Sequence, residues 1–460
     1  CMTATEITET PTQNLTDQLI GAGLSGADLD AEVVRADHGS VFHSWSAQDH
    51  LPSTVVAGGE GAWLWDHAGN RFLDFSSQLV NVNIGYQHPK VVEAIREQAL
   101  ELTTIAPATA NRTRATAAAK ILAHAPENFS KVFFTNAGAD ANENAMRMAR
   151  QVTGRDKIIS RYRSYHGNTG AAVVATGDWR RLPNEYARGH LHVFGPYLYR
   201  SEFWAGTESQ ECERALQHLE HTIVAEGSQS IAGIILESIP GTAGIMVPPA
   251  GYLQGVREIC DRYGIVMICD EVMAGFGRTG NWFAFEGQGV VPDLITFAKG
   301  VNSGYVPAGG VILSDKIAAH FDETVFPGGL TYSGHPLAMA AIVATITAME
   351  DEGTVEHAAE LGEKVIGPAL HALEPLPIVG EVRGTGVFWA VELVSDKTTR
   401  EPLPAARMAD IKAACLEQGL VITVADNRIH VVPSCVITEE DAATGLEILA
   451  TAITAVSAAV

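Results

Sequence analysis

The chain has 460 residues, of which 46% are hydrophobic and 18% are charged. This length suits roughly two or three domains, and the composition excludes an intrinsically disordered protein. Lysine and arginine number 31 against 54 aspartates and glutamates, so the net charge is −23. A surface of this sign repels phosphate backbones and anionic lipids, so we expect neither nucleic acid nor membrane as a partner. An anionic substrate would need locally placed cations or backbone dipoles.

Several other classes of protein are excluded because the sequence lacks the patterns that are typical of them. The sequence has no run of about 20 apolar residues that could form a transmembrane helix. Residues 1–14 lack the basic segment followed by an apolar segment that is typical of a signal peptide. The six cysteines are scattered without a CxxC pair, and the 16 histidines show no metal-ligand spacing. We therefore expect a cytoplasmic protein with reduced thiols and no metal site.

The N-terminal part of the chain shows three patterns in succession. Residues 28–38 are compatible with a helix or with a mobile arm. Residues 57–75 alternate apolar and polar side chains around an Asp-His-Ala-Gly-Asn turn, which predicts a β-hairpin. Residues 90–102 have helical spacing.

The middle of the chain alternates short apolar runs with helical stretches, and we expect each run to be a strand. The runs are 131–135, 156–161, 170–177, 231–238, 264–271, 293–299 and 308–314. Such alternation is typical of an α/β fold with a mainly parallel sheet, here of seven strands, that is covered by helices on both faces.

Beyond His335 the pattern changes to a long Ala-rich helix, followed by predicted strands in residues 380–393 and 427–434. We interpret this part as a smaller α+β unit that is built from both chain ends. The predicted organisation has three parts: an N-terminal segment with part of the small domain, a large domain, and the rest of the small domain. Their bounds are 1–80, 81–335 and 336–460.

Polar residues follow three of the predicted strands, where parallel sheets bind ligands. Asp270 and Glu271 end one run, and Lys299 ends another. Residues 131–150 place a turn of small residues between a strand and a helix, and the free N–H groups of that turn suit a phosphate. Taken singly, these features also fit a capping acid, a surface lysine and an Asn-capped helix.

Together, the three features match the needs of pyridoxal phosphate. This cofactor requires an anchor for its phosphate, a carboxylate on its pyridine nitrogen and a lysine that forms a Schiff base. A competing motif, Gly275-Phe-Gly-Arg-Thr-Gly280, matches the GxGxxG fingerprint of nicotinamide-dependent oxidoreductases. It does not directly follow a strand, and no helical pattern follows it, so the context of that fingerprint is missing.

Five ordered motifs resemble those of the class III pyridoxal-phosphate-dependent aminotransferases, which have fold type I. The motifs are FFTNAGADANE, SYHGNT, CDEVMAGFGRTG, PDLITFAKG and LTYSGHP. The resemblance extends from about Val41 to near the C-terminus. It implies an enzyme that moves an amino group from an amine donor to a keto acid by a ping-pong mechanism.

The resemblance also implies roles for individual residues around the cofactor ring. Lys299 would form the Schiff base and then act as the general base, and Asp270 would pair with the pyridine nitrogen. Val272 would pack on one face of the ring. Tyr165 would stack on the other face, with His166 beside it.

Further implied roles concern the cofactor phosphate and the assembly. Gly138 and Ala139 would donate backbone N–H groups to the phosphate, although the family often has Ser at the position of Ala139. Glu237 would hydrogen-bond near Asp270. Thr331 would reach the phosphate of a neighbouring subunit, which implies a homodimer with shared active sites and leaves a tetramer open.

The substrate site is less well defined by the resemblance. Many members carry a carboxylate-binding arginine near the C-terminus, but here Thr423 stands at that position. Arg428 and Arg163 are the candidate replacements, and Arg428 could equally be an ordinary charge at a strand end. Val80 stands where amine-acting members tend to have an aromatic residue, and Trp45 is expected to line the pocket instead.

The segments around Trp45, Val80 and Arg428 are most similar to the taurine or ω-amino-acid branch of the family, so we expect such a donor and pyruvate or 2-oxoglutarate as acceptor. An aminomutase, a decarboxylating transaminase or a phospholyase would keep the same cofactor residues and stays an alternative. A non-catalytic scaffold with this fold would be expected to lose Lys299 or Asp270, and both are present.

Overall fold

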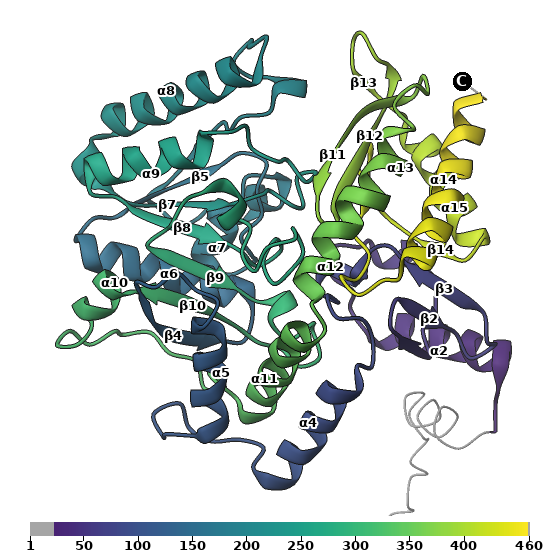
Figure 1. The fold of residues 1–460 in the computed structure, drawn as a ribbon, viewed down its shortest axis with the longest axis horizontal. Helices are drawn as coiled ribbons and strands as arrows, with labels where there is room; N and C mark the ends of the chain where they lie inside the picture. Colours follow the sequence, from purple (N-terminus) through teal and green to yellow (C-terminus); the bar gives the residue numbers. More distant parts are fainter. Residues whose placement is uncertain (1–22, 459–460) are drawn as a thin grey trace, which may run out of the picture.

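A seven-stranded sheet forms the centre of one side of the molecule in the computed structural model, which describes residues 23–458 (Figure 1). Its strand order is β4-β10-β9-β8-β7-β5-β6. The strands are β4 (Phe129–Thr135), β5 (Lys157–Arg161), β6 (His190–Val193), β7 (Ile231–Glu237), β8 (Val266–Asp270), β9 (Leu294–Phe297) and β10 (Gly309–Ser314). Only β10 is antiparallel to its neighbours, so the prediction of an α/β fold with a mainly parallel sheet of seven strands is confirmed.

Helices cover both faces of this sheet because its strands are apolar on both sides. Ile158 and Ile159 are adjacent in β5 and belong to two different apolar clusters. One face packs against α6 (Gly138–Thr153), α7 (Gly170–Ala175) and α10 (Asp315–His320). The other packs against α4 (Pro89–Glu101), α5 (Arg112–Leu122), α8 (Glu208–Glu226), α9 (Tyr252–Tyr263) and α11 (Pro336–Asp351).

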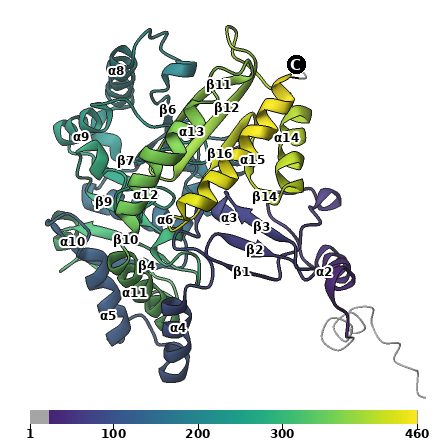
Figure 2. The ribbon, with the colours of Figure 1, turned by 45° about the vertical axis from the view of Figure 1, so that its right-hand side comes forward.

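Two smaller sheets lie beside the large one and combine both ends of the chain (Figure 2). The first consists of β1 (Gly58–Glu60), β2 (Trp63–Trp65), β3 (Arg71–Asp74) and β14 (Leu420–Val421). The second consists of β11 (Val379–Thr385), β12 (Phe388–Asp396), β13 (Glu401–Pro402), β15 (Thr423–Ala425) and β16 (Arg428–Val431). The predicted hairpin is formed by β2 and β3, and β3 pairs in parallel with β14.

One apolar core joins these two sheets to the helices of the second half of the chain. Leu73 and Phe75 belong to the same buried cluster as residues from Ala358 to Val456. The helices here are α12 (Thr354–Leu361), α13 (Gly367–His371), α14 (Ala405–Glu417) and α15 (Glu439–Ala458). In contrast, α11 contributes its apolar side chains to the core of the large sheet. The domain bounds at 80/81 and 335/336 stay a prediction.

The N-terminal region contains α2 (Gly26–Ser40), which confirms the helical interpretation of residues 28–38, and the short helix α3 (Ser77–Val80). Cys1 and the segment compared with signal peptides lie outside the described residues. None of the described helices combines the length and the apolar character that a membrane crossing requires.

The prediction of a strand in residues 170–177 is wrong, because Gly170–Ala175 form helix α7. A short, wholly buried apolar run has no periodicity that distinguishes a strand from a helix. The helix is selected by a distant side chain: Glu143 of α6 accepts the backbone N–H groups of Ala171 at 2.9 Å and Ala172 at 3.0 Å. The seventh strand is instead β6, four residues at the sheet edge that the sequence analysis did not predict.

The Glu143 contact gives a test of how α7 is held. Glu143→Ala would leave two N–H groups of the first turn of α7 without their anionic acceptor, which costs about 2 kcal/mol. We expect a lower free energy of unfolding in urea titrations. Glu258→Ala, which removes an exposed glutamate from another helix, is the matched control and should change stability little. Equal effects of the two substitutions would contradict this role of Glu143.

Candidate active site

Three neighbouring parallel strands carry polar residues to one edge of the sheet. β7 ends at Glu237 and β8 ends at Asp270, whereas Lys299 follows β9 by two residues. Since β9, β8 and β7 are adjacent, these side chains meet at the carboxyl edge, where α/β sheets bind ligands.

A cavity of about 620 Å³ opens at this edge. The candidate residues that line it are Trp45, Gly138, Ala139, Tyr165, His166, Glu237, Asp270, Val272 and Lys299. The structure therefore brings together most of the residues that the sequence singled out, from six separate segments of the chain.

Four candidate residues lie outside this lining. Val80 is buried in an apolar cluster, while its neighbours Leu79 and Asn81 face the cavity. Thr331 is exposed in the segment before α11. Arg163 and Arg428 line a second cavity.

Asp270 is 3% exposed. Three groups contact its carboxylate and hold it in place. Its Oδ2 atom accepts a hydrogen bond from Asn142 at 2.7 Å and lies 2.8 Å from Nδ1 of His166. Its Oδ1 atom accepts the backbone N–H of Val272 at 3.0 Å. Thr296 donates to Asn142 at 2.6 Å and so fixes the orientation of that amide. This shell leaves Oδ1 able to accept one more hydrogen bond from the cavity.

Lys299 lies in the same cavity under unusual constraints. Its backbone has φ of 43°, a left-handed conformation that a non-glycine residue rarely adopts and that is concentrated at functional sites. Within residues 23–458, no group forms a hydrogen bond with its amine. Burial by the cavity walls lowers the pKa of Lys299 to about 8; Asp270 and Glu237 oppose the shift, and Arg278 and Arg180 add to it. A larger fraction of the amine is thus neutral near physiological pH.

Glu237 connects two loops at the cavity rim. One carboxylate oxygen accepts the backbone N–H of Tyr165 at 3.0 Å, and the other accepts that of Gly241 at 2.9 Å. Burial raises the pKa of Glu237, and these backbone donors act against the shift. Glu237 therefore positions Tyr165, which lines the same cavity.

The N-terminus of α6 approaches the cavity closely. Its N-cap residue, Ala137, has no side chain that could accept the first N–H groups of the helix. Gly138 has to be a glycine here, because a Cβ atom would lie 2.7 Å from Val272. Gly138 and Ala139 thus present helix N-terminal N–H groups to the cavity, an arrangement that favours an anion.

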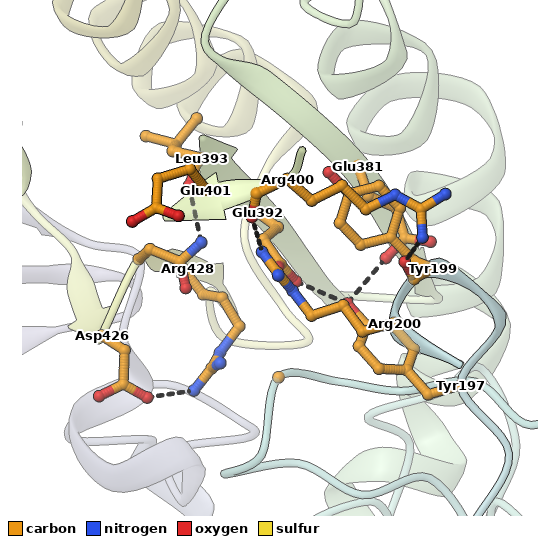
Figure 3. A network of polar contacts seen from close by, with 12 residues as sticks. Tyr197, Tyr199, Arg200, Glu381, Glu392, Leu393, Arg400, Glu401, Asp426 and Arg428 are labelled. Carbon is orange, nitrogen blue, oxygen red and sulfur yellow. Dashed lines mark hydrogen bonds and ion pairs between the residues drawn. The ribbon is translucent and has the colours of Figure 1, made fainter. Parts of the chain in front are cut away.

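The second cavity, of about 490 Å³, adjoins the first at Trp45 and Thr242, which line both. Two of its arginines are held by carboxylates (Figure 3). Arg200 lies 2.6 Å from Glu392, and Arg428 lies 2.7 Å from Asp426. Arg163 and Arg180 complete its set of four arginines.

Sequence reasoning missed two residues of this region. Asn142 orients the carboxylate of Asp270. The sequence could have indicated this residue, because it is a polar side chain on the sheet-facing side of α6, one turn after the predicted phosphate site. Arg180 lies with its guanidinium carbon 3.9 Å from the centre of the Tyr165 ring. Its position in a 3₁₀ turn, Trp179–Asn184, gave no periodic signal.

The residues present fit pyridoxal phosphate. The cavity combines an unpaired lysine amine, a buried carboxylate with a free acceptor position and a helix N-terminus without a cap. These groups suit an aldehyde, a protonated pyridine nitrogen and a phosphate, respectively. Lys299, Asp270 and the first residues of α6 would hold the cofactor.

Comparisons with known proteins agree with this site. The family model "Aminotransferase class-III" matches residues 45–453. The chain is 38% identical to an uncharacterized aminotransferase of Bacillus subtilis, covering 91% of this chain and 96% of the relative. It is 34% identical to the taurine–pyruvate aminotransferase of Rhodobacter capsulatus, covering 87% and 90%.

A solved structure shares the whole architecture. It is the taurine:2-oxoglutarate aminotransferase of Bifidobacterium kashiwanohense in complex with pyridoxal phosphate and glutamate. The TM-score is 0.90 with 40% identity, over 95% of this chain and 99% of the other. The structure, the family model and the relatives agree: this chain belongs to the class III aminotransferases, enzymes that use pyridoxal phosphate.

Proposed function

We propose that this aminotransferase takes the amino group from an ω-amino acid with a distal acid group, such as taurine or β-alanine, and gives it to pyruvate or 2-oxoglutarate. The observation that carries the proposal is that two cavities adjoin at Trp45 and Thr242. Lys299 lines the first cavity, and four arginines line the second. The names of the relatives from R. capsulatus and B. kashiwanohense support taurine as a donor and these keto acids as acceptors.

In this proposal the residues of the first cavity bind and orient the cofactor. When bound, pyridoxal phosphate withdraws electrons from the substrate carbon that loses its proton. Asp270 would accept a hydrogen bond from the pyridine nitrogen, while His166 and Asn142 hold the carboxylate in place. Tyr165 and Val272, which line the same cavity, would pack against the ring.

Lys299 would hold the cofactor through its amine. Because its pKa is lowered to about 8, a larger fraction of this amine is neutral than for an ordinary lysine, so it would be suited to accept the proton of the substrate carbon as a general base.

The proposal also includes the assembly and the location. Thr331 is exposed and lies outside the cavity of its own chain, which is consistent with a contact to the phosphate in a second subunit. We therefore propose a homodimer with shared active sites and leave a further pairing into tetramers open. The five described cysteines are free and buried, which is consistent with the cytoplasm.

The role of Lys299 predicts the behaviour of Lys299→Ala. The substitution removes both the covalent anchor and the proton-transfer group, so kcat should fall by at least about 100-fold. Borohydride reduction followed by peptide mass spectrometry should find the cofactor attached to Lys299 in the wild type and absent in the variant. Lys316→Ala, at an exposed lysine, should keep activity and labelling. Attachment of the cofactor to another lysine would refute the assignment.

The lowered pKa of Lys299 predicts a pH dependence for loading the apoenzyme. Only the neutral amine attacks the aldehyde, and it becomes the major form above about pH 8 rather than above the ordinary value of 10.5. The rate of attachment, followed by absorbance after mixing, should rise with pH and level off above about pH 8. A rate that keeps rising to the ordinary lysine value would show that the cavity does not depress this pKa.

The substrate class predicts the outcome of a donor panel. Taurine, β-alanine, 4-aminobutyrate and 1-phenylethylamine would each be tested with pyruvate and with 2-oxoglutarate, and the amino acid product measured by chromatography. We expect the donors with acid groups to react with the higher kcat/KM, because the second cavity offers cations to their acid end. Activity with 1-phenylethylamine alone would contradict the proposed donor class.

A further inference from the structure

A third, small cavity lies at the carboxyl ends of β5 and β6. Arg161, the last residue of β5, and Phe194, the first residue after β6, both belong to its wall. Its volume is about 10 Å³, close to the smallest that can hold one water molecule or one monatomic ion. Among the described residues, none lines both this cavity and the cavity of Lys299.

The wall of this third cavity carries more positive than negative charge. Three arginines line it, Arg161, Arg163 and Arg200, against one carboxylate, Glu202. Arg163 pairs with Glu202 at 3.3 Å, and Arg200 pairs with Glu392 at 2.6 Å. Within residues 23–458 no carboxylate forms an ion pair with Arg161, so the charge of this arginine is left without a contacting partner.

Arg161 is almost fully buried, at 4% exposure. Its guanidinium forms part of the cavity wall: it lies against another wall residue, Gly195, where a Cβ atom would collide with Nε and Nη2. Nε is buried and has no hydrogen-bond partner among the described groups. The ring of Tyr252, with its centre 5.8 Å from the guanidinium carbon, gives the cation only a distant aromatic contact.

A buried charge is costly unless it is paired and hydrogen-bonded. Burial lowers the pKa of Arg161; Tyr252 and Glu237 oppose this shift, and Arg163 adds to it. Both carboxylate oxygens of Glu237 are already taken by backbone N–H groups. Because arginine keeps its proton in proteins, its charge has to be offset from outside the chain. A water molecule in the cavity would accept hydrogen bonds but leave the charge unbalanced, whereas an anion would do both.

We propose that the third cavity binds one chloride ion against the guanidinium of Arg161. The cavity is too small for sulfate, phosphate or the acid group of a substrate. The chloride site therefore differs in its ligand from the second cavity, although Arg163 and Arg200 line both. The ion neutralises a buried charge where β5 passes into the loop that carries Tyr165, and its binding requires no particular donor or acceptor.

Thermal unfolding of the holoenzyme measures this binding without catalysis. The titration uses potassium chloride against potassium gluconate at constant ionic strength, since gluconate does not fit the third cavity. An ion that binds only the folded protein raises Tm, so Tm should increase by about 2 °C and level off as the site fills. Bromide should act like chloride. A Tm that is the same in chloride and in gluconate would overturn the chloride site.

Two matched variants show which arginine carries the response. Arg161→Met keeps the length of the side chain without its charge, so the response to chloride should be lost. In gluconate this variant should be at least as stable as the wild type, because an unpaired buried charge is removed. Arg180→Met changes an arginine that lines the second cavity but not the third, and it should keep the full response.

The same variants also give the outcomes that contradict the proposal. Loss of the response in Arg180→Met, together with its retention in Arg161→Met, would place the ion in the second cavity. An equal loss of stability of Arg161→Met in both salts would show that Arg161 acts only by packing. Either result would overturn the chloride site.

Anomalous scattering from bromide locates the ion directly and does not require that a variant folds. Crystals of the wild-type holoenzyme grown in bromide should show an anomalous peak within hydrogen-bond distance of the Arg161 guanidinium. Crystals of Arg161→Met should lack this peak. A density without anomalous signal in the wild type would identify a water molecule, and a peak in the second cavity alone would identify another anion site; both would contradict the proposal.

Discussion

The candidate site depends on one buried carboxylate that its neighbours hold in a fixed orientation. Asp270 is 3% exposed, and an unpaired buried carboxylate would be costly. Asn142, His166 and the backbone of Val272 offset this cost and leave one acceptor position open toward the cavity. The strand β8 brings Asp270 to the sheet edge, α6 brings Asn142, and the loop after β5 brings His166.

The same edge has to bind anions in a protein of net charge −23. The general field disfavours a phosphate and an acidic substrate, so local groups must hold them. In our proposal, N–H groups of α6 serve the phosphate and arginines of the second cavity serve the substrate acid. Each of these arginines has a carboxylate partner, which keeps the charge of the cavity low.

The sequence could single out residues that line the first cavity because several of them stand at the ends of apolar strands. Asp270 is the last residue of β8 and Lys299 is the first polar side chain after β9, so the strand pattern and the parallel topology together place them at one edge. Helix α7 was mistaken for a strand because its apolar run is buried on all sides. Its helical form depends on Glu143, a residue 27 or more positions earlier in the chain.

By itself, the sequence determined the fold class, the reaction family and the residues that follow the strands, because these depend on local periodicity and on motifs within short segments. Only the tertiary structure decided which cations lie together beside the cavity of Lys299. Arg163, Arg180 and Arg428 come from three separate segments, namely the loop after β5, the 3₁₀ turn Trp179–Asn184 and the start of β16. Their roles depend on which carboxylate or ring each one contacts, and those contacts form only when the two cavities are assembled.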